Sequence, residues 1–376
     1  MLMEGLHTMV SEVYVRLREK LDTLGVGYPA TETGIEYTFL TKLFTPEEAE
    51  LFIAMPDEFH TAKEFAASLG KDPQVLADKL EGMAQKGLLY RVREESGVKY
   101  RVPPIIVGLF EFNAAANRID QSMLPDFFGH FVGGLGQRLF DTDTPIVRAI
   151  PVKTDIVVDN KVLPIDDAEL ILRKHKHLAV SECVCRKMGK LLSSPCTHSI
   201  NTCLAMGDTA KYYVENGWGK YITVDEALAI IKDGDEKGRV VEVVNSQDAE
   251  FMCSCCSCCC ASLKALEISG VDAVGRPHVT NYSCVRDETI CVGTCSDTCT
   301  GRCPTHAQKL VDGSPQIDPK LCIGCGLCVT TCPTGALSLV KKPDDAIYNP
   351  PAATLYDSWD AQARYVAAQK QADSKA

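Results

Sequence analysis

The sequence predicts a multidomain α+β protein, and two observations carry that prediction. Helix and hairpin signals alternate in the first 104 residues, whereas all 19 cysteines lie between Cys183 and Cys332. A chain of 376 residues is also long enough for two to four domains. We expect a helix followed by a helix-and-hairpin domain in residues 1–104, and a helical linker with short strands in 105–164. A mixed α/β cysteine-rich metal or cluster domain should occupy 165–275, a second small cysteine domain 276–345, and a flexible tail 346–376.

The composition excludes several classes of protein. The formal net charge of −11 disfavours a nucleic acid as the main partner, because phosphate binding needs a basic surface. A disulfide scaffold would be small, secreted and stapled throughout, which this chain is not. The first 21 residues include acidic side chains and no apolar core, so we expect no signal peptide. No apolar stretch reaches about 18 residues, so we expect no membrane span and a cytoplasmic location.

The N-terminal residues carry start and stop signals for four helices and a hairpin. Apolar spacing predicts an amphipathic helix over 1–21. Thr45-Pro46 followed by two glutamates is a helix start, and Gly70 and Gly87 end the two later helices. The expected helices span 45–55, 62–69 and 72–86, and the expected strands 88–92 and 98–102. This order of elements resembles a winged helix-turn-helix domain over residues 40–104.

Charge argues against DNA binding by this winged-helix-like domain. Residues 45–103 contain 11 acidic and 8 basic side chains. The expected recognition helix carries Asp78 and Glu81 beside Lys79 and Lys86. A protein-docking module is therefore favoured over a DNA reader.

The middle of the chain shows weaker signals. Residues 105–140 are apolar and predict helix, as a packing segment between domains. Residues 146–152 and 156–162 predict short strands, and a helix is expected from Asp166 to about Lys174. Further helices are expected over 209–215 and 224–233. They contain no cysteine, so we expect them to be a scaffold that folds one cysteine group onto another.

A regular cysteine run lies near the C-terminus. It reads Cys322-x2-Cys325-x2-Cys328-x3-Cys332-Pro333, which is the run of bacterial ferredoxins. Two-residue steps wrap three thiolates around one cubane, and Gly324 and Gly326 permit the tight turns. A zinc site usually has two cysteine pairs separated by a longer insert, so the spacing favours iron–sulfur.

A second run lies upstream and is wider. It reads Cys291-x3-Cys295-x3-Cys299-x3-Cys303-Pro304, with two gaps one residue longer than in the family pattern. Cys284 is a conceivable substitute ligand. The resemblance to two-cluster 4Fe–4S ferredoxins covers residues 280–342 and implies crossed ligation. The implied ligand sets are Cys291, Cys295, Cys299 and Cys332 for one cluster, and Cys322, Cys325, Cys328 and Cys303 for the other. Strands are expected over 307–311 and 336–340, as in the pseudo-twofold ferredoxin-like fold.

Ten further cysteines lie in the middle domain. They are Cys183, Cys185, Cys196, Cys203, Cys253, Cys255, Cys256, Cys258, Cys259 and Cys260. So dense a set of free thiols would oxidise readily, which indicates metal; iron–sulfur is favoured, with zinc the alternative. Adjacent cysteine pairs cannot both cap one cubane, so they indicate two sites or an unusual cluster, similar to the paired-cysteine motifs of heterodisulfide-reductase-type proteins.

Several non-cysteine side chains near the first thiols are also candidates. Arg186, Lys187 and Lys190 could offset thiolate charge or contact an acidic partner, or they could form a solvated basic helix face. His198 is a possible ligand or a neighbouring surface residue.

The overall layout resembles uncharacterised 4Fe–4S binding proteins of strict anaerobes. The resemblance rests on segments 182–186, 196–204 and 253–259 between the N-terminal and ferredoxin-like domains, and it implies anaerobic electron transfer. We expect the ferredoxin-like subunit of an oxidoreductase complex with protein redox partners. The chain has no dinucleotide or Walker fingerprint, so a partner would carry any flavin or nicotinamide. The alternatives are a redox-sensing winged-helix regulator and an enzyme with a catalytic cluster at the central cysteines.

Overall fold

The computed structural model describes residues 10–140, 142–264, 278–293, 296–311 and 314–374. Contacts divide the chain into two compact units: unit 1 contains Met1–Thr144, Tyr212–Trp218 and Tyr356–Ala376, and unit 2 contains Pro145–Lys211 and Gly219–Leu355. The division falls inside the predicted linker 105–164, and the two cysteine regions share one unit. Among the described residues, no helix is both long and apolar enough to cross a membrane.

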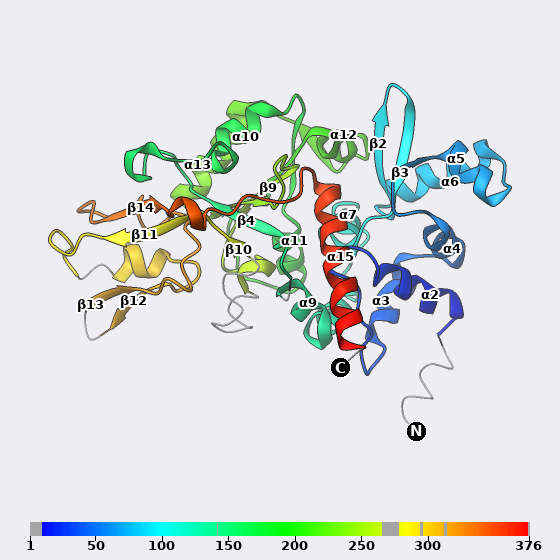
Figure 1. The fold of residues 1–376 in the computed structure, drawn as a ribbon, viewed down its shortest axis with the longest axis horizontal. Coiled ribbons are helices and arrows are strands. Elements are labelled where there is room, and N and C mark those ends of the chain that lie inside the picture. The colour runs from blue at the N-terminus through cyan, green and yellow to red at the C-terminus, as the bar shows by residue number, and fades with distance from the viewer. Residues whose placement is uncertain (1–9, 141, 265–277, 294–295, 312–313, 375–376) are drawn as a thin grey trace. The chain divides into compact units, whose positions relative to one another are not determined.

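Unit 1 starts with helices and a hairpin that the sequence predicted, and with one helix, Ile35–Leu43, that it did not predict. Helices α2 (Glu12–Leu21), α3 (Ile35–Leu43), α4 (Pro46–Ala54), α5 (Ala62–Leu69) and α6 (Pro73–Gln85) come in order, followed by the hairpin β2 (Tyr90–Glu94) and β3 (Gly97–Arg101) (Figure 1). The short strand β1 (His60–Thr61) pairs antiparallel with β3. The predictions for α4, α5, α6 and the hairpin are confirmed to within two residues. The helix expected over 1–21 corresponds to α2, and residues 1–9 of the expected range lie outside the described residues.

Local capping explains why these helices begin where they do. The Thr45 backbone N–H donates to Glu48 Oε2 at 2.9 Å, and the Glu48 N–H donates to Thr45 Oγ1 at 3.3 Å. Thr61 and Glu64 form the same reciprocal pair at the start of α5. Each capping box satisfies backbone donors that the first helical turn leaves open.

Residues 105–140 are helical with interruptions. An irregular turn at Ile105–Leu109 precedes helix α7 (Phe110–Ala115), residues 116–123 connect α7 to α8 (Leu124–His130), and a second irregular turn at Phe131–Leu135 connects α8 to α9 (Gly136–Phe140). Gly108 and Gly134 have backbone angles outside the helical region, which breaks what the apolar pattern had suggested as a continuous helix.

The C-terminal residues are not a flexible tail, so that prediction is wrong. Residues Leu355–Asp373 form the 19-residue helix α15. Trp359 on α15 is buried and lies 6.1 Å from Tyr90 between ring centroids, within unit 1. Lys370 Nζ pairs with Asp22 Oδ2 at 2.7 Å. Buried side chains at intervals of about one and two turns hold the helix in place in spite of its polar composition.

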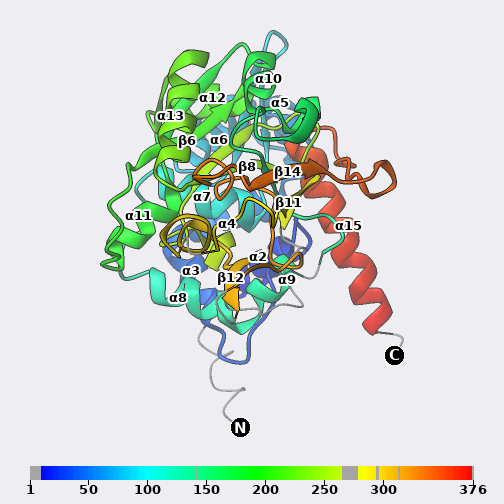
Figure 2. The ribbon, with the colours of Figure 1, turned by 90° about the vertical axis from the view of Figure 1, so that its left-hand side faces the viewer.

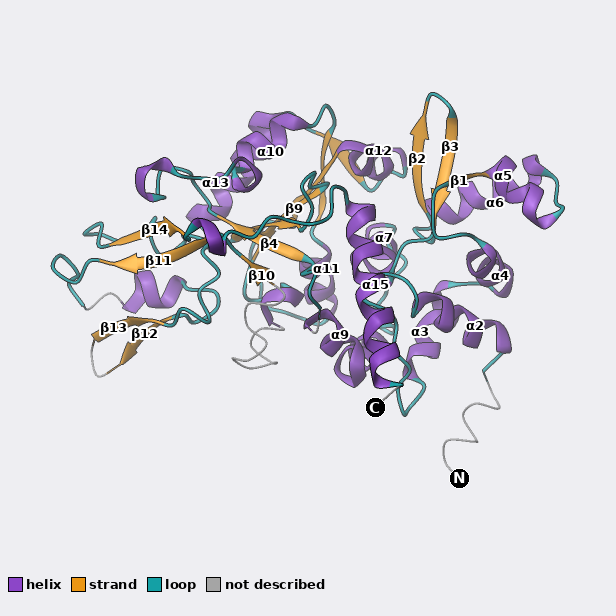
Figure 3. Ribbon diagram, viewed as in Figure 1, coloured by secondary structure: helices purple, strands orange, loops and turns teal. Residues whose placement is uncertain are grey.

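Unit 2 is built on a seven-stranded sheet (Figure 3). The spatial order is β10 (His278–Val279), β4 (Val147–Ile150), β8 (Val240–Val244), β9 (Phe251–Cys255), β6 (Asn201–Met206), β5 (Leu178–Glu182) and β7 (Gly219–Tyr221). The β10–β4 pair is parallel and the other pairs are antiparallel. Strand β10 follows the central cysteines in sequence and forms one edge of this sheet, beside β4.

Three helices lie close to the predicted positions: α10 (Ala168–Lys174) and α13 (Val224–Glu236) in unit 2, and α12 (Gly207–Glu215), which begins in unit 2 and ends in unit 1. Unit 2 also contains α11 (Val184–Leu191), for which the sequence predicted no range. The cap of α10 is Asp167, whose side chain accepts from the N–H groups of Glu169 and Leu170. The strand expected over 156–162 is absent, because these described residues form turns with a single bridge from Val157 to Leu339. Ile156 and Val157 are apolar because they pack into the core from a loop.

Candidate metal centres

Two small strand pairs frame the C-terminal cysteine runs. Strand β11 (Tyr282–Arg286) pairs antiparallel with β14 (Leu337–Lys341), and β12 (Gln308–Val311) pairs antiparallel with β13 (Ser314–Ile317). Figure 2 shows β11 and β14 side by side. Each cysteine run therefore lies between one strand of each pair, and the strands expected over 307–311 and 336–340 are present as β12 and β14.

One hollow of about 330 Å³ collects the thiols of the regular run. Cys322, Cys325 and Cys328 line it, together with Cys303 from the upstream run. Cys284 lines this same hollow: its Sγ lies 3.6 Å from Cys328 Sγ.

A second hollow of about 350 Å³ collects the thiols of the upstream run. Cys291 and Cys299 line it together with Cys332 from the regular run. Cys295 lies outside the described residues. In both hollows, the last cysteine of one run lies with the earlier cysteines of the other. Cys284 lines the hollow of Cys322 and not that of the widened run, so its expected role as a substitute there gains no support.

The surroundings of these thiols suit a bound metal. Burial raises the pKa of the Cys325 thiol well above its ordinary value. Burial also raises the pKa of Cys322, although N–H groups of Cys284 and Gly324 point at its sulfur and oppose the rise. A buried thiol becomes a thiolate when a cation supplies the compensating charge, and a coordinating thiol is deprotonated outright. The donor set is therefore chemically matched to a metal cluster.

Gly324 lets the regular run turn tightly beside a strand. Its φ is +62°, and an added Cβ would lie 2.6 Å from the backbone oxygen of Tyr282. Gly335 has φ of +68° but nothing within 4 Å of an added Cβ. Comparing alanine substitutions at these two glycines therefore separates the cost of backbone strain from the cost of steric overlap with the strand.

We expect Gly324→Ala to destabilise unit 2 by about 2–5 kcal/mol, as left-handed strain plus overpacking. The matched control Gly335→Ala should cost only about 1–2 kcal/mol, from strain alone. Anaerobic thermal unfolding and iron content would measure both. Equal losses in the two variants would contradict the overlap argument.

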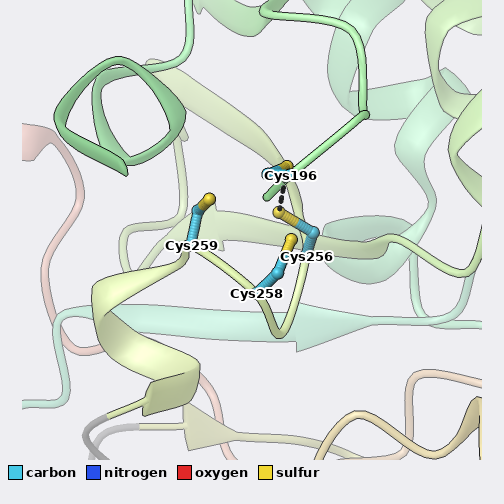
Figure 4. Close-up of side chains that lie close together, drawn as sticks. All are labelled: Cys196, Cys256, Cys258 and Cys259. Carbon is cyan, nitrogen blue, oxygen red and sulfur yellow. Dashed lines mark hydrogen bonds between the residues drawn. The ribbon is translucent and has the colours of Figure 1, made fainter. Parts of the chain in front are cut away.

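The central thiols form two sets, and the first has four members. Cys196, Cys256, Cys258 and Cys259 place their Sγ atoms within 4.8 Å of one another (Figure 4). Cys196 comes from the loop after α11, and the other three come from the turn that follows β9. The Cys196 and Cys256 sulfurs are 3.9 Å apart. We call this group the four-thiol set.

The other six central cysteines form a second set, the six-thiol set. Its members are neighbours in the order Cys183, Cys185, Cys260, Cys255, Cys253 and Cys203, and each thiol shifts the pKa of the next. Strand pairing explains part of this order, because Leu204 is opposite Met252, which brings Cys203 beside Cys253. Cys253 and Cys255 are two residues apart on β9 and so share one face. All ten central cysteines thus fall into one set or the other.

Adjacent cysteines diverge between the two sets. Cys255 belongs to the six-thiol set and Cys256 to the four-thiol set; Cys259 and Cys260 separate in the same way. Of the two arrangements that the adjacent pairs allow, two sites or one unusual cluster, this division favours two sites.

A buried charged side chain lies at each set, and the sequence analysis missed the one at the six-thiol set. Glu242 on β8 is buried, and its Oε2 accepts from Cys255 Sγ at 3.3 Å, with Cys260 also within 4.8 Å. A single charged residue in the otherwise apolar strand Val240–Val244 was the available signal. At the four-thiol set, Arg186 is buried and donates to Cys256 Sγ at 3.5 Å. Burial lowers the pKa of Arg186, but the thiols of Cys183 and Cys256 outweigh it and raise the pKa overall.

The other non-cysteine candidates from the sequence have fewer contacts with the thiols. Lys187 pairs with Glu182 at 3.2 Å, and Lys190 is exposed. Of the three basic residues, Arg186 alone is buried beside thiols. His198 is half-buried and joins no group of potential metal ligands among the described residues.

Comparison with known proteins identifies one domain. Residues 315–338 match the 4Fe-4S binding domain family, so the chain carries a 4Fe–4S binding domain near its C-terminus. Similar proteins include an iron-sulfur protein of Rhodospirillum rubrum, 50% identical over 46 residues, which are 12% of this chain and 24% of that protein. A subunit of the Na⁺-translocating ferredoxin:NAD⁺ oxidoreductase complex of Acetobacterium woodii is 39% identical over 51 residues, which are 13% of this chain and 15% of that protein.

A longer similarity extends beyond the ferredoxin-type region. An uncharacterized protein of Methanocaldococcus jannaschii is 27% identical over 199 residues, which are 50% of this chain and 76% of that protein. The chain spans about a quarter or less of the two named relatives. No solved structure matches.

Proposed function

We propose that this protein transfers single electrons through two 4Fe–4S clusters. Cys291, Cys295, Cys299 and Cys332 would hold one cluster, and Cys322, Cys325, Cys328 and Cys303 the other. The observation that carries the proposal is the exchange between the hollows, each of which receives the last cysteine of the opposite run. Clusters bound in this way exchange one electron at a time, at potentials set by hydrogen bonds and solvent access.

The central cysteines would form the other end of the electron path. Cys325 belongs to the same apolar core as Cys255 and Cys260, within unit 2. The backbone of the two regions is also joined, since the Val152 N–H donates to the Cys325 carbonyl at 3.1 Å. A cluster at Cys322–Cys328 would therefore lie against the protein layer that contains the six-thiol set. Such proximity supports electron passage to or from a central metal site.

The protein would work as a subunit of an anaerobic cytoplasmic oxidoreductase complex. Similarity to a subunit of a ferredoxin:NAD⁺ oxidoreductase complex supports a role with protein redox partners. Unit 1, with its winged-helix-like order of elements, would dock such a partner. Basic side chains around α6 are neutralised within unit 1: Lys86 pairs with Glu48 at 2.6 Å, and Arg93 pairs with Glu81 at 2.9 Å. This pairing disfavours DNA as the docked partner.

A catalytic role is the second candidate, and Glu242 is the observation that favours it. A carboxylate among thiols offers one weaker, exchangeable position at a metal cluster, where a substrate could bind. Glu242→Gln should then abolish catalysis while leaving the ferredoxin-type electron signals unchanged. If catalysis persists in that variant together with the electron signals, a catalytic role for this carboxylate is wrong.

Anaerobic analysis of iron and acid-labile sulfide in the purified full chain tests the main proposal. Two ferredoxin-type clusters require about eight irons and eight sulfides per chain, and a further cluster raises both to about twelve. Reductive titration should show the clusters accepting one electron each. Fewer than about eight irons after full reconstitution, or iron without sulfide, would contradict the two-cluster proposal.

A further inference from the structure

The four-thiol set has the dimensions of a site for one metal ion. A tetrahedral zinc ion with Zn–S bonds of about 2.3 Å holds its sulfurs about 3.8 Å apart. Cys196 and Cys256 already lie at 3.9 Å, and the four sulfurs all lie within 4.8 Å of one another. In a cubane, each thiolate binds a different iron at a separate corner, so the thiolates stand farther apart than around one ion. The compact spacing therefore favours a single ion over a cluster.

The backbone holds these four sulfurs in that arrangement. Cys256, Cys258 and Cys259 share one tight turn, which is closed by the Cys260 N–H donating to the Cys256 carbonyl at 2.9 Å. Gly189 on α11 makes room beside the turn, because an added Cβ would lie 2.8 Å from Cys259 Sγ. In Figure 4 the sulfurs of the turn and of Cys196 lie close together. Four converging soft donors from two segments are typical of a structural metal site.

The charge around the set suits a tetrathiolate site. Four thiolates and one divalent cation carry a net charge of −2, which needs nearby positive charge when it is partly buried. Arg186 supplies one such charge, since this buried guanidinium contacts Cys256 Sγ at 3.5 Å. It also donates to the Ser254 carbonyl at 3.1 Å, which fixes it against β9. The two functions of Arg186 are thus to offset part of the charge of the site and to hold the strand before the turn.

We propose that Cys196, Cys256, Cys258 and Cys259 bind one zinc ion, as a site separate from the six-thiol set. On binding, each thiol releases its proton and donates a sulfur lone pair to the ion, so no redox change is involved. The site pins the loop after α11 to the turn after β9. This inference deepens the proposed central metal site and does not depend on the ferredoxin-type clusters.

Metal analysis of full-chain variants tests the inference. The double variant Cys196→Ser/Cys258→Ser should lose about one zinc per chain, with iron and sulfide unchanged. Cys258→His should retain the zinc, because a three-cysteine, one-histidine set is also a zinc site. Cys183→Ser, in the six-thiol set, is the matched control and should leave zinc unchanged. If the double variant loses iron and sulfide and keeps its zinc, the inference is overturned.

A second measurement needs no variant and so does not depend on variant folding. Zinc-edge X-ray absorption of the native chain should show four sulfurs at about 2.3 Å. Nitrogen or oxygen ligands, or no bound zinc, would overturn the inference. Iron and sulfide present at ferredoxin stoichiometry in that same sample would leave the proposed electron transfer standing, so the two failures are distinguishable.

Discussion

The double variant Cys303→Ala/Cys322→Ala is expected to retain one intact 4Fe–4S cluster of the ferredoxin-type pair. Both thiols line the hollow of about 330 Å³, although they come from different runs. Removing both therefore damages the same cluster and spares the other. By contrast, Cys322→Ala/Cys332→Ala should leave no intact cluster of the pair, because Cys332 lines the other hollow.

These two double variants are matched in chemistry and differ only in which hollows they affect. Spin counting after anaerobic reduction, with iron and sulfide analysis, would give the number of intact clusters relative to the unmodified chain. If each run supplied all four ligands of its own cluster, the two results would be reversed. The measurement thus decides between crossed and uncrossed ligation.

Trp359→Ala is expected to destabilise unit 1 by about 3–5 kcal/mol, as for other buried aromatic residues. The indole is buried among Tyr90 and Tyr356, and the Arg101 guanidinium lies 5.6 Å from its ring centroid. Removing it leaves a cavity and loses a cation–π contact. Ending the chain before Tyr356 should have a larger effect, because unit 1 would then lose nearly all of α15.

The control for this prediction lies on the same helix. Arg364 is exposed, and Arg364→Ala should change stability by less than about 0.5 kcal/mol. Denaturant unfolding followed by far-ultraviolet circular dichroism, a signal that does not depend on Trp359, would measure the stability of all three variants. A tail without a structural role would give the same midpoint for the truncated and full-length chains, which would contradict the assignment of α15 to unit 1.

The sequence was sufficient to predict those parts of the structure that depend on neighbouring residues. The capping boxes at Thr45 and Thr61 fixed helix starts, and the spacing of the regular cysteine run was enough to indicate a 4Fe–4S domain. The C-terminal helix could also have been predicted, because Leu355, Trp359 and Val366 recur at helical intervals within a polar segment. The flexible tail expected over 346–376 overlooks this spacing.

Other features depend on partners that are distant in sequence. Ile156 and Val157 look like a strand, but they pack against the core from a loop. The buried position of Arg186 could not be told from an exposed basic helix face, because its partners Ser254 and Cys256 are about 70 residues away. The division of the thiols into two sets follows from strand register and from the turn after β9, neither of which the cysteine spacing specifies.

The turn after β9 has a consequence for how the protein matures. Within six residues it directs Cys256, Cys258 and Cys259 to one thiol set and Cys255 and Cys260 to the other. An ion that fixes the turn from one side also positions the ligands on the other side, and by thermodynamic linkage the benefit is reciprocal. Filling one set would therefore orient the ligands of the other and speed its loading, whereas the final metal content at saturating metal would stay the same.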